Sequence, residues 1–317
     1  MTYSYDRSMF EAPPPQAMPA GRSRRDRRDG AGYIWNADLE LAVNIALATE
    51  RPLLVRGPSG TGKSSLAASL ARAKGWRYYE EVVSSTTEAR HLMWKFETLK
   101  RLSDSQAGGA KPAVHYVEPG VLWWAFDPES AQRRGMAAGV LPEIEDPNRF
   151  RVNTSERAVV LIDEIDKADP DVPNNLLVPL GSLEFSVTDA ENASVKAIVP
   201  PVVVITTNDE RELPGAFLRR CVVIKLESPD RAALLRIAEA HFGQDANSLF
   251  ERVADAMDAV AVAKKVRALP SPSTAEFLDA IGTCRDLKVT PGDHPTWRAI
   301  ERAVFYKPGI QDDQRNP

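Results

Sequence analysis

Cysteine is scarce in this sequence. Cys221 and Cys284 are the only two among 317 residues, and each stands in ordinary core-like or helical sequence. Two cysteines with such flanks exclude both a disulfide framework and a zinc site of the usual ligand spacing. We therefore expect a protein of a reducing compartment, the cytoplasm.

Long apolar runs and an excess of positive charge are also missing. No segment approaches the roughly 18 to 20 apolar residues of a membrane-spanning helix, and the opening MTYSYDRSMF lacks the apolar stretch of a signal peptide. The formal net charge of −4 argues against bulk electrostatic capture of nucleic acid. We expect no membrane span, and nucleic acid is not the expected partner. Hydrophobic residues make up 43% of the chain, enough for one large domain or two smaller ones.

Both ends contain few large apolar side chains. Residues 1–31 hold three consecutive prolines and the stretch GRSRRDRRDG, in which aspartates offset the arginines. Such a composition cannot bury enough surface to offset the entropy of ordering the chain. We predict a disordered tail over residues 1–31, with its arginines solvated rather than bound to an anionic partner, and a second tail over residues 307–317.

Short continuous apolar runs indicate buried strands. They occupy residues 53–55, 78–83, 158–162 and 202–205, with a shorter, interrupted run at 221–226. Helical patterns separate them, the first beginning after Asn36, a candidate N-cap. Runs without polar alternation are typical of parallel strands covered on both faces. We predict an α/β domain over residues 32–227.

The sequence changes character after Ser228. Residues 228–306 are rich in Ala, Leu and Glu, and their apolar residues recur at helical spacing, as in Phe250, Val253, Ala254 and Met257. A small all-helical domain is expected there. Within the α/β part, the polar or Gly- and Pro-rich stretches are expected to be surface insertions; these are residues 103–111 and 127–156.

The stretch GPSGTGKS, Gly57 to Ser64, matches the phosphate-binding pattern G-x-x-x-x-G-K-[ST] between a predicted strand and a predicted helix. Its glycines let successive backbone N–H groups point at an anion, and the helix dipole adds positive potential. Lys63 would reach the β- and γ-phosphates, and the Ser64 hydroxyl would ligate Mg²⁺. The predicted nucleotide-binding residues of the loop are Gly57, Pro58, Ser59, Gly60, Thr61, Gly62, Lys63, Ser64 and Ser65.

The base of the nucleotide is less strongly specified. No N-K-x-D element, the usual source of guanine specificity, is present, so ATP is favoured over GTP. Tyr33 and Ile34, just before the first predicted helix, are candidates to cover the base, although packing in a core explains them nearly as well.

The stretch AVVLIDEIDKAD places two carboxylates after five apolar residues. A buried strand would deliver them to the C-terminal edge of the sheet, where ligands of open α/β sheets bind. Asp163 would hold Mg²⁺ through water opposite Ser64, and Glu164 would act as general base on the attacking water. The next charged residues are expected to cap and solvate the following helix: Asp166, Lys167 and Asp169.

Two further stretches carry candidate catalytic residues. VVVITTND ends a predicted strand with Asn208, whose amide can orient a water against the γ-phosphate without adding charge. ELPGAFLRRCVVI places Arg219 and Arg220 just before the last strand-like run. The two arginines could form a surface rim or enter a neighbouring subunit's site.

Together these motifs resemble the AAA+ ATPases, and more narrowly their MoxR branch (the helix-2-insert clade), over roughly residues 33–280. The resemblance implies a parallel sheet sandwiched by helices and followed by a helical lid. Besides GPSGTGKS and VVLIDEIDKAD, it is carried by DVPNNLLVPL (171–180), ITTNDERELPGAFLRRC (205–221), STTEARHLMWKFETLKRL (85–102) and YVEPGVLWWAF (116–126).

The resemblance implies a role for each matching residue. Lys63 and Ser64 match Walker A, Asp163 and Glu164 match Walker B, and Asn208 matches sensor 1. Arg220 best matches the arginine finger, with Arg219 as the neighbour that could replace it. Such a finger acts in trans, where it contributes about 10³ to 10⁵ in rate, and therefore implies a closed ring, usually a hexamer.

Other family features are matched less closely. Residues 184–198 resemble the clade's hairpin before sensor 1, although a plain edge hairpin would have the same sequence. Residues 87–111 correspond to the second-helix insertion, and the large aromatics nearby are expected in the core: Trp94, Phe96, Trp123 and Trp124. The lid lacks the usual sensor 2 arginine and has Ser271 and Ser273 instead; Arg267 or Arg285 could serve.

The favoured function is ATP-driven, chaperone-like remodelling of a protein client, often one with a von Willebrand factor A domain. A restriction-like nucleic-acid motor of the same clade, possibly GTP-using, is the alternative; it would need a basic pore or an appended DNA-binding domain. A small-molecule kinase would need neither a water-activating glutamate nor arginines acting between subunits.

Overall fold

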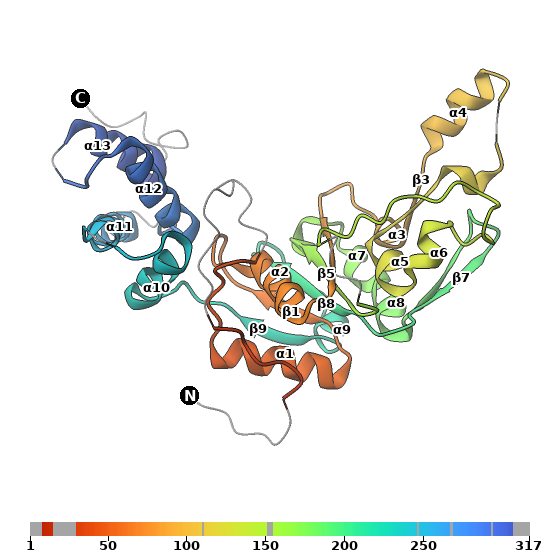
Figure 1. Ribbon diagram of the computed structural model, residues 1–317, viewed down its shortest axis with the longest axis horizontal. Coiled ribbons are helices and arrows are strands. Elements are labelled where there is room, and N and C mark those ends of the chain that lie inside the picture. Colours follow the sequence, from red (N-terminus) through yellow and green to blue (C-terminus); the bar gives the residue numbers. More distant parts are fainter. Residues whose placement is uncertain are drawn as a thin grey trace.

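The computed structural model describes residues 8–14, 30–109, 111–150, 155–245, 247–266, 269–292 and 294–306. Five parallel strands form its central sheet, in the order β2-β5-β8-β1-β9. The strands are β1 (Leu53–Arg56), β2 (Arg77–Val82), β5 (Ala158–Asp163), β8 (Val202–Thr207) and β9 (Val222–Lys225). Each apolar run predicted to be a strand contributes one, which confirms the predicted parallel α/β sheet (Figure 1).

Both faces of the sheet are covered, because successive strand residues enter different cores. In β1, Leu53 and Val55 pack with α1 (Ala37–Thr49) and α2 (Lys63–Lys74), whereas Leu54 packs on the opposite side. In β5, Val159 and Leu161 alternate in the same way with their neighbours. A strand has a side-chain period of two, so a strand buried on both faces reads as a continuous apolar run.

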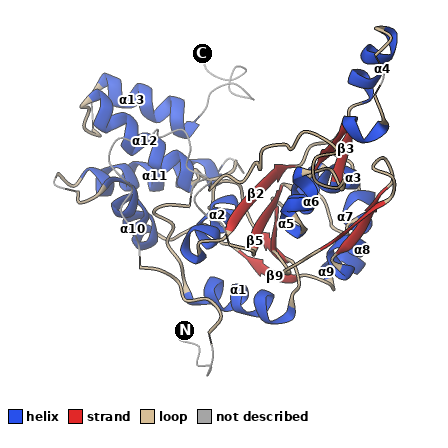
Figure 2. Ribbon diagram, turned by 45° about the vertical axis from the view of Figure 1, so that its right-hand side comes forward, coloured by secondary structure: helices blue, strands red, loops and turns tan. Residues whose placement is uncertain are grey.

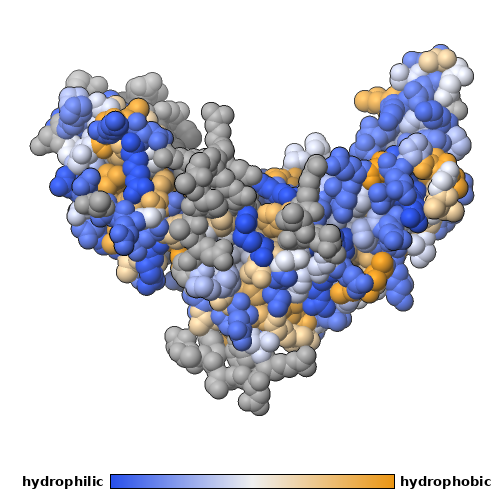
Figure 3. Space-filling model, viewed as in Figure 1, coloured by the Kyte–Doolittle hydropathy of each residue, from blue (hydrophilic) through white to orange (hydrophobic). Residues whose placement is uncertain are grey.

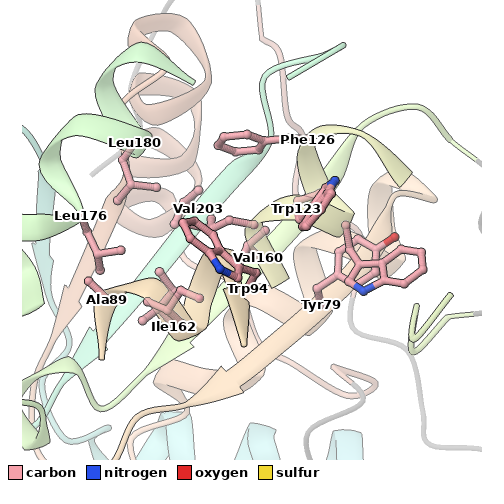
Figure 4. Packing of buried hydrophobic residues seen from close by; sticks show 14 of the residues in the cluster. Tyr79, Ala89, Trp94, Trp123, Phe126, Val160, Ile162, Leu176, Leu180 and Val203 are labelled. Carbon is pink, nitrogen blue, oxygen red and sulfur yellow. The ribbon is translucent and has the colours of Figure 1, made fainter. Parts of the chain in front are cut away.

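The second face is covered by short elements. Their bounds are α3 (Ala89–Met93), α5 (Val121–Phe126), α6 (Pro128–Gln132), η3 (Ile165–Lys167), α7 (Asp171–Asn175), α8 (Leu177–Ser182) and α9 (Gly215–Leu218). Trp94 and Trp123 are buried here, as predicted (Figure 4). Trp124 is also buried, as predicted, and Phe96 packs against the same cluster while partly exposed. In its described part, the predicted surface insertion at residues 127–156 contains helix α6 and buries Leu141, so it does not lie wholly on the surface.

An antiparallel hairpin packs on this aromatic cluster. Strands β6 (Glu184–Val187) and β7 (Ala193–Lys196) pair as the sequence predicted. The ring of Phe185 lies 5.7 to 6.4 Å, between centroids, from the rings of Trp94, Trp123 and Phe126. The Trp94 indole also donates a hydrogen bond to Asp189 at the hairpin tip.

A second excursion projects from the same side of the molecule. Strands β3 (Trp94–Phe96) and β4 (Val117–Pro119) pair antiparallel and carry between them α4 (Thr98–Gln106) and the 3-10 turn η2 (Ala113–Tyr116). Helix α4 buries none of its residues and points away from the sheet (Figures 1 and 2). Its surface is mainly hydrophilic (Figure 3), with Leu99 81% exposed. The predicted surface stretch 103–111 thus begins inside a helix.

The C-terminal helices form a separate bundle at the end of the molecule opposite α4 (Figure 1). They are α10 (Arg231–Phe242), α11 (Leu249–Val266), α12 (Thr274–Leu287) and α13 (Pro295–Glu301), followed by the π-helical turn η4 (Arg302–Tyr306). Their buried apolar residues, including Phe250, Phe277 and Phe305, form a core of their own. This bundle is the predicted helical lid.

Residues 8–14 correct the prediction of a tail that buries nothing. Phe10 is 1% exposed and belongs to the core beneath α1 and α2. One large aromatic ring suffices to anchor a segment whose average composition is that of a disordered chain. Most of the predicted tails, residues 1–7, 15–29 and 307–317, lie outside the described residues. No helix in the described part of the chain is long and apolar enough to cross a membrane.

Candidate functional site

The phosphate-binding loop lies between β1 and α2, and its glycines have a backbone conformation that other residues rarely adopt. Gly57, Gly60 and Gly62 have φ angles of 144°, 78° and 90°. A Cβ atom on Gly57 would lie 2.3 Å from the carbonyl oxygen of Leu226, so the end of β9 also excludes a side chain there. The loop therefore keeps a fixed curl that ends at the N-terminus of α2.

Lys63 is buried beneath this loop, with 5% of its surface exposed. Its Nζ donates hydrogen bonds to the carbonyl oxygens of Gly57 (2.7 Å) and Pro58 (2.8 Å) and to Oδ1 of Asn208 (2.7 Å). Burial lowers the pKa of Lys63, an effect that the nearby carboxylate of Asp163 opposes. The structure thus places two predicted site residues, Lys63 and Asn208, in direct contact across the ends of β1 and β8.

Asp163 and Ser64 also meet. The Ser64 hydroxyl donates to Oδ1 of Asp163 at 2.8 Å, and the Thr206 hydroxyl donates to the same oxygen at 2.6 Å. Asp163 is 3% exposed. A hydroxyl and a carboxylate at a phosphate-binding loop are the hard oxygen donors that Mg²⁺ uses, with water and phosphate completing its shell. The residues present therefore fit the predicted metal.

Glu164 follows Asp163 in a left-handed backbone conformation, with φ 61° and ψ 49°. Its N–H donates to the Thr206 hydroxyl at 2.9 Å. Its carboxylate accepts from the Asn208 amide at 3.3 Å and from Nζ of Lys167 at 2.7 Å. The general-base candidate and the candidate for orienting water therefore share a hydrogen bond.

Two neighbouring residues depart from the prediction that they only cap and solvate the next helix. Lys167 forms an ion pair with the candidate base Glu164. Asp166 is 3% exposed and accepts hydrogen bonds from the backbone N–H groups of Asn208 and Glu210, which holds the loop after β8 in place. Only Asp169 behaves as predicted, accepting from the N–H of residue 171 at the start of α7.

A cavity of about 510 Å³ contains the site. The phosphate-binding loop, Asp163, Glu164 and Asn208 line it with polar groups. Its lining also includes the apolar side chains of Ile34, Leu39, Ile237 and Leu278, and the ring of Tyr33 beside Gly62. A cavity with both polar and apolar lining suits a nucleotide, which has charged phosphates and a flat base.

The lid lines this cavity from α10 and α12. Ser273 lies very close to the phosphate-binding loop: a Cβ atom added to Gly60 would be 2.6 Å from the Cβ atom of Ser273. Arg285 does not reach the cavity: its guanidinium stacks over the rings of Phe242 and Phe250 and donates to a backbone carbonyl of α10. Arg285 is therefore no sensor 2 candidate, and Arg267 lies outside the described residues. Sequence reasoning missed Arg236, which lines the cavity from α10.

Arg219 and Arg220 lie at the opposite edge of the sheet. Both precede β9, whose first residue pairs with Leu53 at the start of β1, whereas the phosphate-binding loop follows the end of β1. Four strand residues separate the two edges by on the order of 13 Å. Both side chains are exposed, and Arg220 lines a separate cavity of about 280 Å³ beside Cys221. The structure does not bring these arginines to the chain's own phosphate-binding loop.

Comparisons with known proteins agree with this geometry. A family model described as "AAA domain (dynein-related subfamily)" matches residues 52–221. No curated protein matches the chain.

Among solved structures, a candidate ATPase from Cytophaga hutchinsonii is 13% identical, with a TM-score of 0.41, covering 84% of this chain and 80% of its own. Two RuvB variants from Thermotoga maritima are 13% and 15% identical, each with a TM-score of 0.43. They cover 87% and 86% of this chain and 72% and 70% of their own. These are distant likenesses, and they carry no inference about function.

Proposed function

The chain belongs to the dynein-related subfamily of AAA domains and is a P-loop ATPase, and from this premise we propose that it hydrolyses Mg²⁺-ATP in a closed ring to remodel a protein client, as MoxR-type proteins do. The observation that carries the proposal is the convergence of Lys63, Asp163, Glu164 and Asn208, from three separate stretches of chain, in one cavity.

Each residue of this site has a part in hydrolysis. The Lys63 ammonium exchanges its contacts with loop carbonyls for phosphate oxygens when ATP binds. Ser64, and Asp163 through water, would hold magnesium, which would supply positive charge beside the phosphates. Glu164 accepts a proton from the attacking water, and Asn208 orients that water from the end of β8.

The position of Arg220 supports a ring. Across the sheet from its own loop, Arg220 can stabilise phosphate charge only on a neighbouring copy, as can Arg219 beside it. A contact between two different faces that repeats around a closed path generates a ring. We propose six copies, as is usual for this branch.

The lid supports coupling of hydrolysis to motion. Helices α10 and α12 wall the cavity but have a core separate from that of the sheet. A ligand held between two such parts changes their relative position when its γ-phosphate leaves. The projecting helix α4 and the β6–β7 hairpin lie at the other end, where they are available to a client, such as a von Willebrand factor A domain protein.

The test separates binding from chemistry at Glu164. Glu164→Gln should bind ATP with nearly unchanged affinity but release phosphate at least about 100-fold more slowly, because the amide cannot accept the proton. Calorimetry and a phosphate-release assay measure the two quantities. The variant should also trap the client, which a pull-down with ATP would recover. Full turnover by Glu164→Gln would refute the assignment of the base, and stimulation of hydrolysis by DNA would favour a nucleic-acid motor instead.

A further inference from the structure

Residues 8–12, called here the anchor segment, run beside α1 and are held there by Asn44. Oδ1 of Asn44 accepts from the backbone N–H groups of Met9 (2.7 Å) and Phe10 (2.9 Å), and Nδ2 donates to the carbonyl oxygen of Phe10 (2.8 Å). Asn44 is itself 8% exposed. One buried amide thus pairs with both backbone groups of Phe10, as a neighbouring strand would.

Further contacts tie the same segment to two helices. The N–H of Ala12 donates to the carboxylate of Glu40 on α1 at 3.3 Å. Nζ of Lys74, at the end of α2, donates to the carbonyl oxygen of Met9 at 3.0 Å. The anchor segment is therefore attached to the helix that follows the phosphate-binding loop as well as to α1.

A row of three aromatic rings leads from the anchor segment to the cavity. The Phe10 ring centroid lies 4.7 Å from that of Trp35, and the Trp35 ring lies 5.3 Å from that of Tyr33. The Trp35 indole N–H donates to the hydroxyl of Ser69 on α2 at 3.0 Å. The Trp35 ring thus contacts both Phe10 and Tyr33.

Tyr33 lies directly on the phosphate-binding loop. A Cβ on Gly62 would be 3.3 Å from Cε2 of the Tyr33 ring, and Tyr33 lines the cavity with Ile34. The backbone entering this stretch is fixed as well, because Gly30 lies against α2 so closely that a Cβ would be 2.2 Å from the nitrogen of Ser69. Burial raises the pKa of the Tyr33 hydroxyl.

We propose that the anchor segment positions Tyr33 as the wall against which the base of the bound nucleotide packs, with Phe10 and Asn44 as positioning residues. The inference rests on the proposed function, since it assumes that the phosphates occupy the loop. With the phosphates there, the apolar side chains that line the rest of the cavity with Tyr33, namely Ile34, Leu39, Ile237 and Leu278, are left for the base. Loosening Phe10 then frees Trp35 and Tyr33 and weakens contact with the base, while the phosphate contacts of Lys63 remain.

The experiment compares a nucleotide with a ligand that has phosphates but no base. In the full chain, Phe10→Ala should raise the Kd for ADP about tenfold and leave the Kd for inorganic tripolyphosphate unchanged, both measured by calorimetry. The KM for ATP should rise by a similar factor with kcat nearly unchanged. Met9→Ala is the matched control: this side chain is 41% exposed, and its backbone hydrogen bonds survive the change.

Asn44→Ala provides a second route to the same result if Phe10→Ala folds poorly, since it leaves the Phe10 ring in place and removes its attachment. Equal ADP affinity in the original chain and in the folded variants would overturn the proposal. An equal loss for ADP and tripolyphosphate would also overturn it, because that pattern reports general distortion of the loop. Failure of the original chain to bind ADP at all would refute the proposed function itself.

Discussion

Glu164 has both carboxylate oxygens engaged, one by Lys167 and one by Asn208. A water that is to lose its proton to Glu164, the proposed general base, must share the carboxylate with these two donors, since each oxygen can accept more than one hydrogen bond. The hydrogen bond with Glu164 raises the pKa of Lys167 and so favours its charged form further. In the proposed mechanism, Lys167 therefore competes with the attacking water for the carboxylate of Glu164.

Replacing Lys167 by Ala should raise kcat for ATP hydrolysis about 1.4- to 5-fold without changing the KM, since a partly exposed ion pair contributes about 0.2 to 1 kcal/mol. Steady-state kinetics measure both constants. Lys167→Arg keeps the charge and the competition, so it should stay close to the original rate. A fall in kcat for Lys167→Ala would mean that the lysine assists catalysis instead.

Residues of this site differ in how far the sequence predicts them. Lys63, Asp163, Glu164 and Asn208 follow from buried strands that end at one edge of a parallel sheet, so their convergence is predictable. The contact between Glu164 and Lys167 is not predictable in this way. The direction of the Glu164 side chain depends on a left-handed φ angle of 61°, which no local pattern in the sequence indicates.

Among the elements, the β6–β7 hairpin is attached through the ring of Phe185 as well as through the buried Val187 and Val195. Phe185→Ala should lower the free energy of unfolding by about 2 to 3 kcal/mol, somewhat less than for a fully buried ring, because part of this side chain is exposed. Denaturant unfolding followed by circular dichroism measures the loss. Ser186→Ala, on the exposed face of the same strand, should change the stability by no more than about 0.5 kcal/mol. Equal losses for both variants would show that Phe185 does not anchor the hairpin.

Periodicity predicts elements better than attachments. The five central strands, the hairpin and the lid helices all follow from apolar spacing. The anchor segment does not, because its binding depends on Phe10 and on Asn44, 34 positions away. Phe10 is one aromatic residue in a proline-rich stretch, so the average composition there still predicts disorder. Asn44 lies within the predicted helix α1, and nothing in the apolar pattern of that helix indicates a bound segment.

At the scale of the whole molecule, the separation of Arg220 from Lys63 has a measurable result. Arg220→Ala and Lys63→Ala should each abolish hydrolysis, because each removes one half of every site. Mixed in equal amounts and allowed to exchange subunits, they should recover about a quarter of the sites, those that pair an intact Lys63 with an intact Arg220. Phosphate release by the mixture measures the recovery.

The same mixture made with Arg219→Ala identifies which arginine acts. If Arg220 is the finger, Arg219→Ala alone should retain most of its activity. Absence of recovery in every mixture, with subunit exchange shown by labelled protein, would mean that the arginines do not act between copies.

The sheet domain and the lid have separate cores, and both line the nucleotide cavity. A ligand bound in this cavity would contact both parts. Movement of the lid away from the sheet would break the ligand's contacts with one of the two parts. By mass action, a higher ATP concentration should therefore make this opening rarer. We therefore expect the two parts of a subunit to separate less readily with nucleotide bound than with the cavity empty.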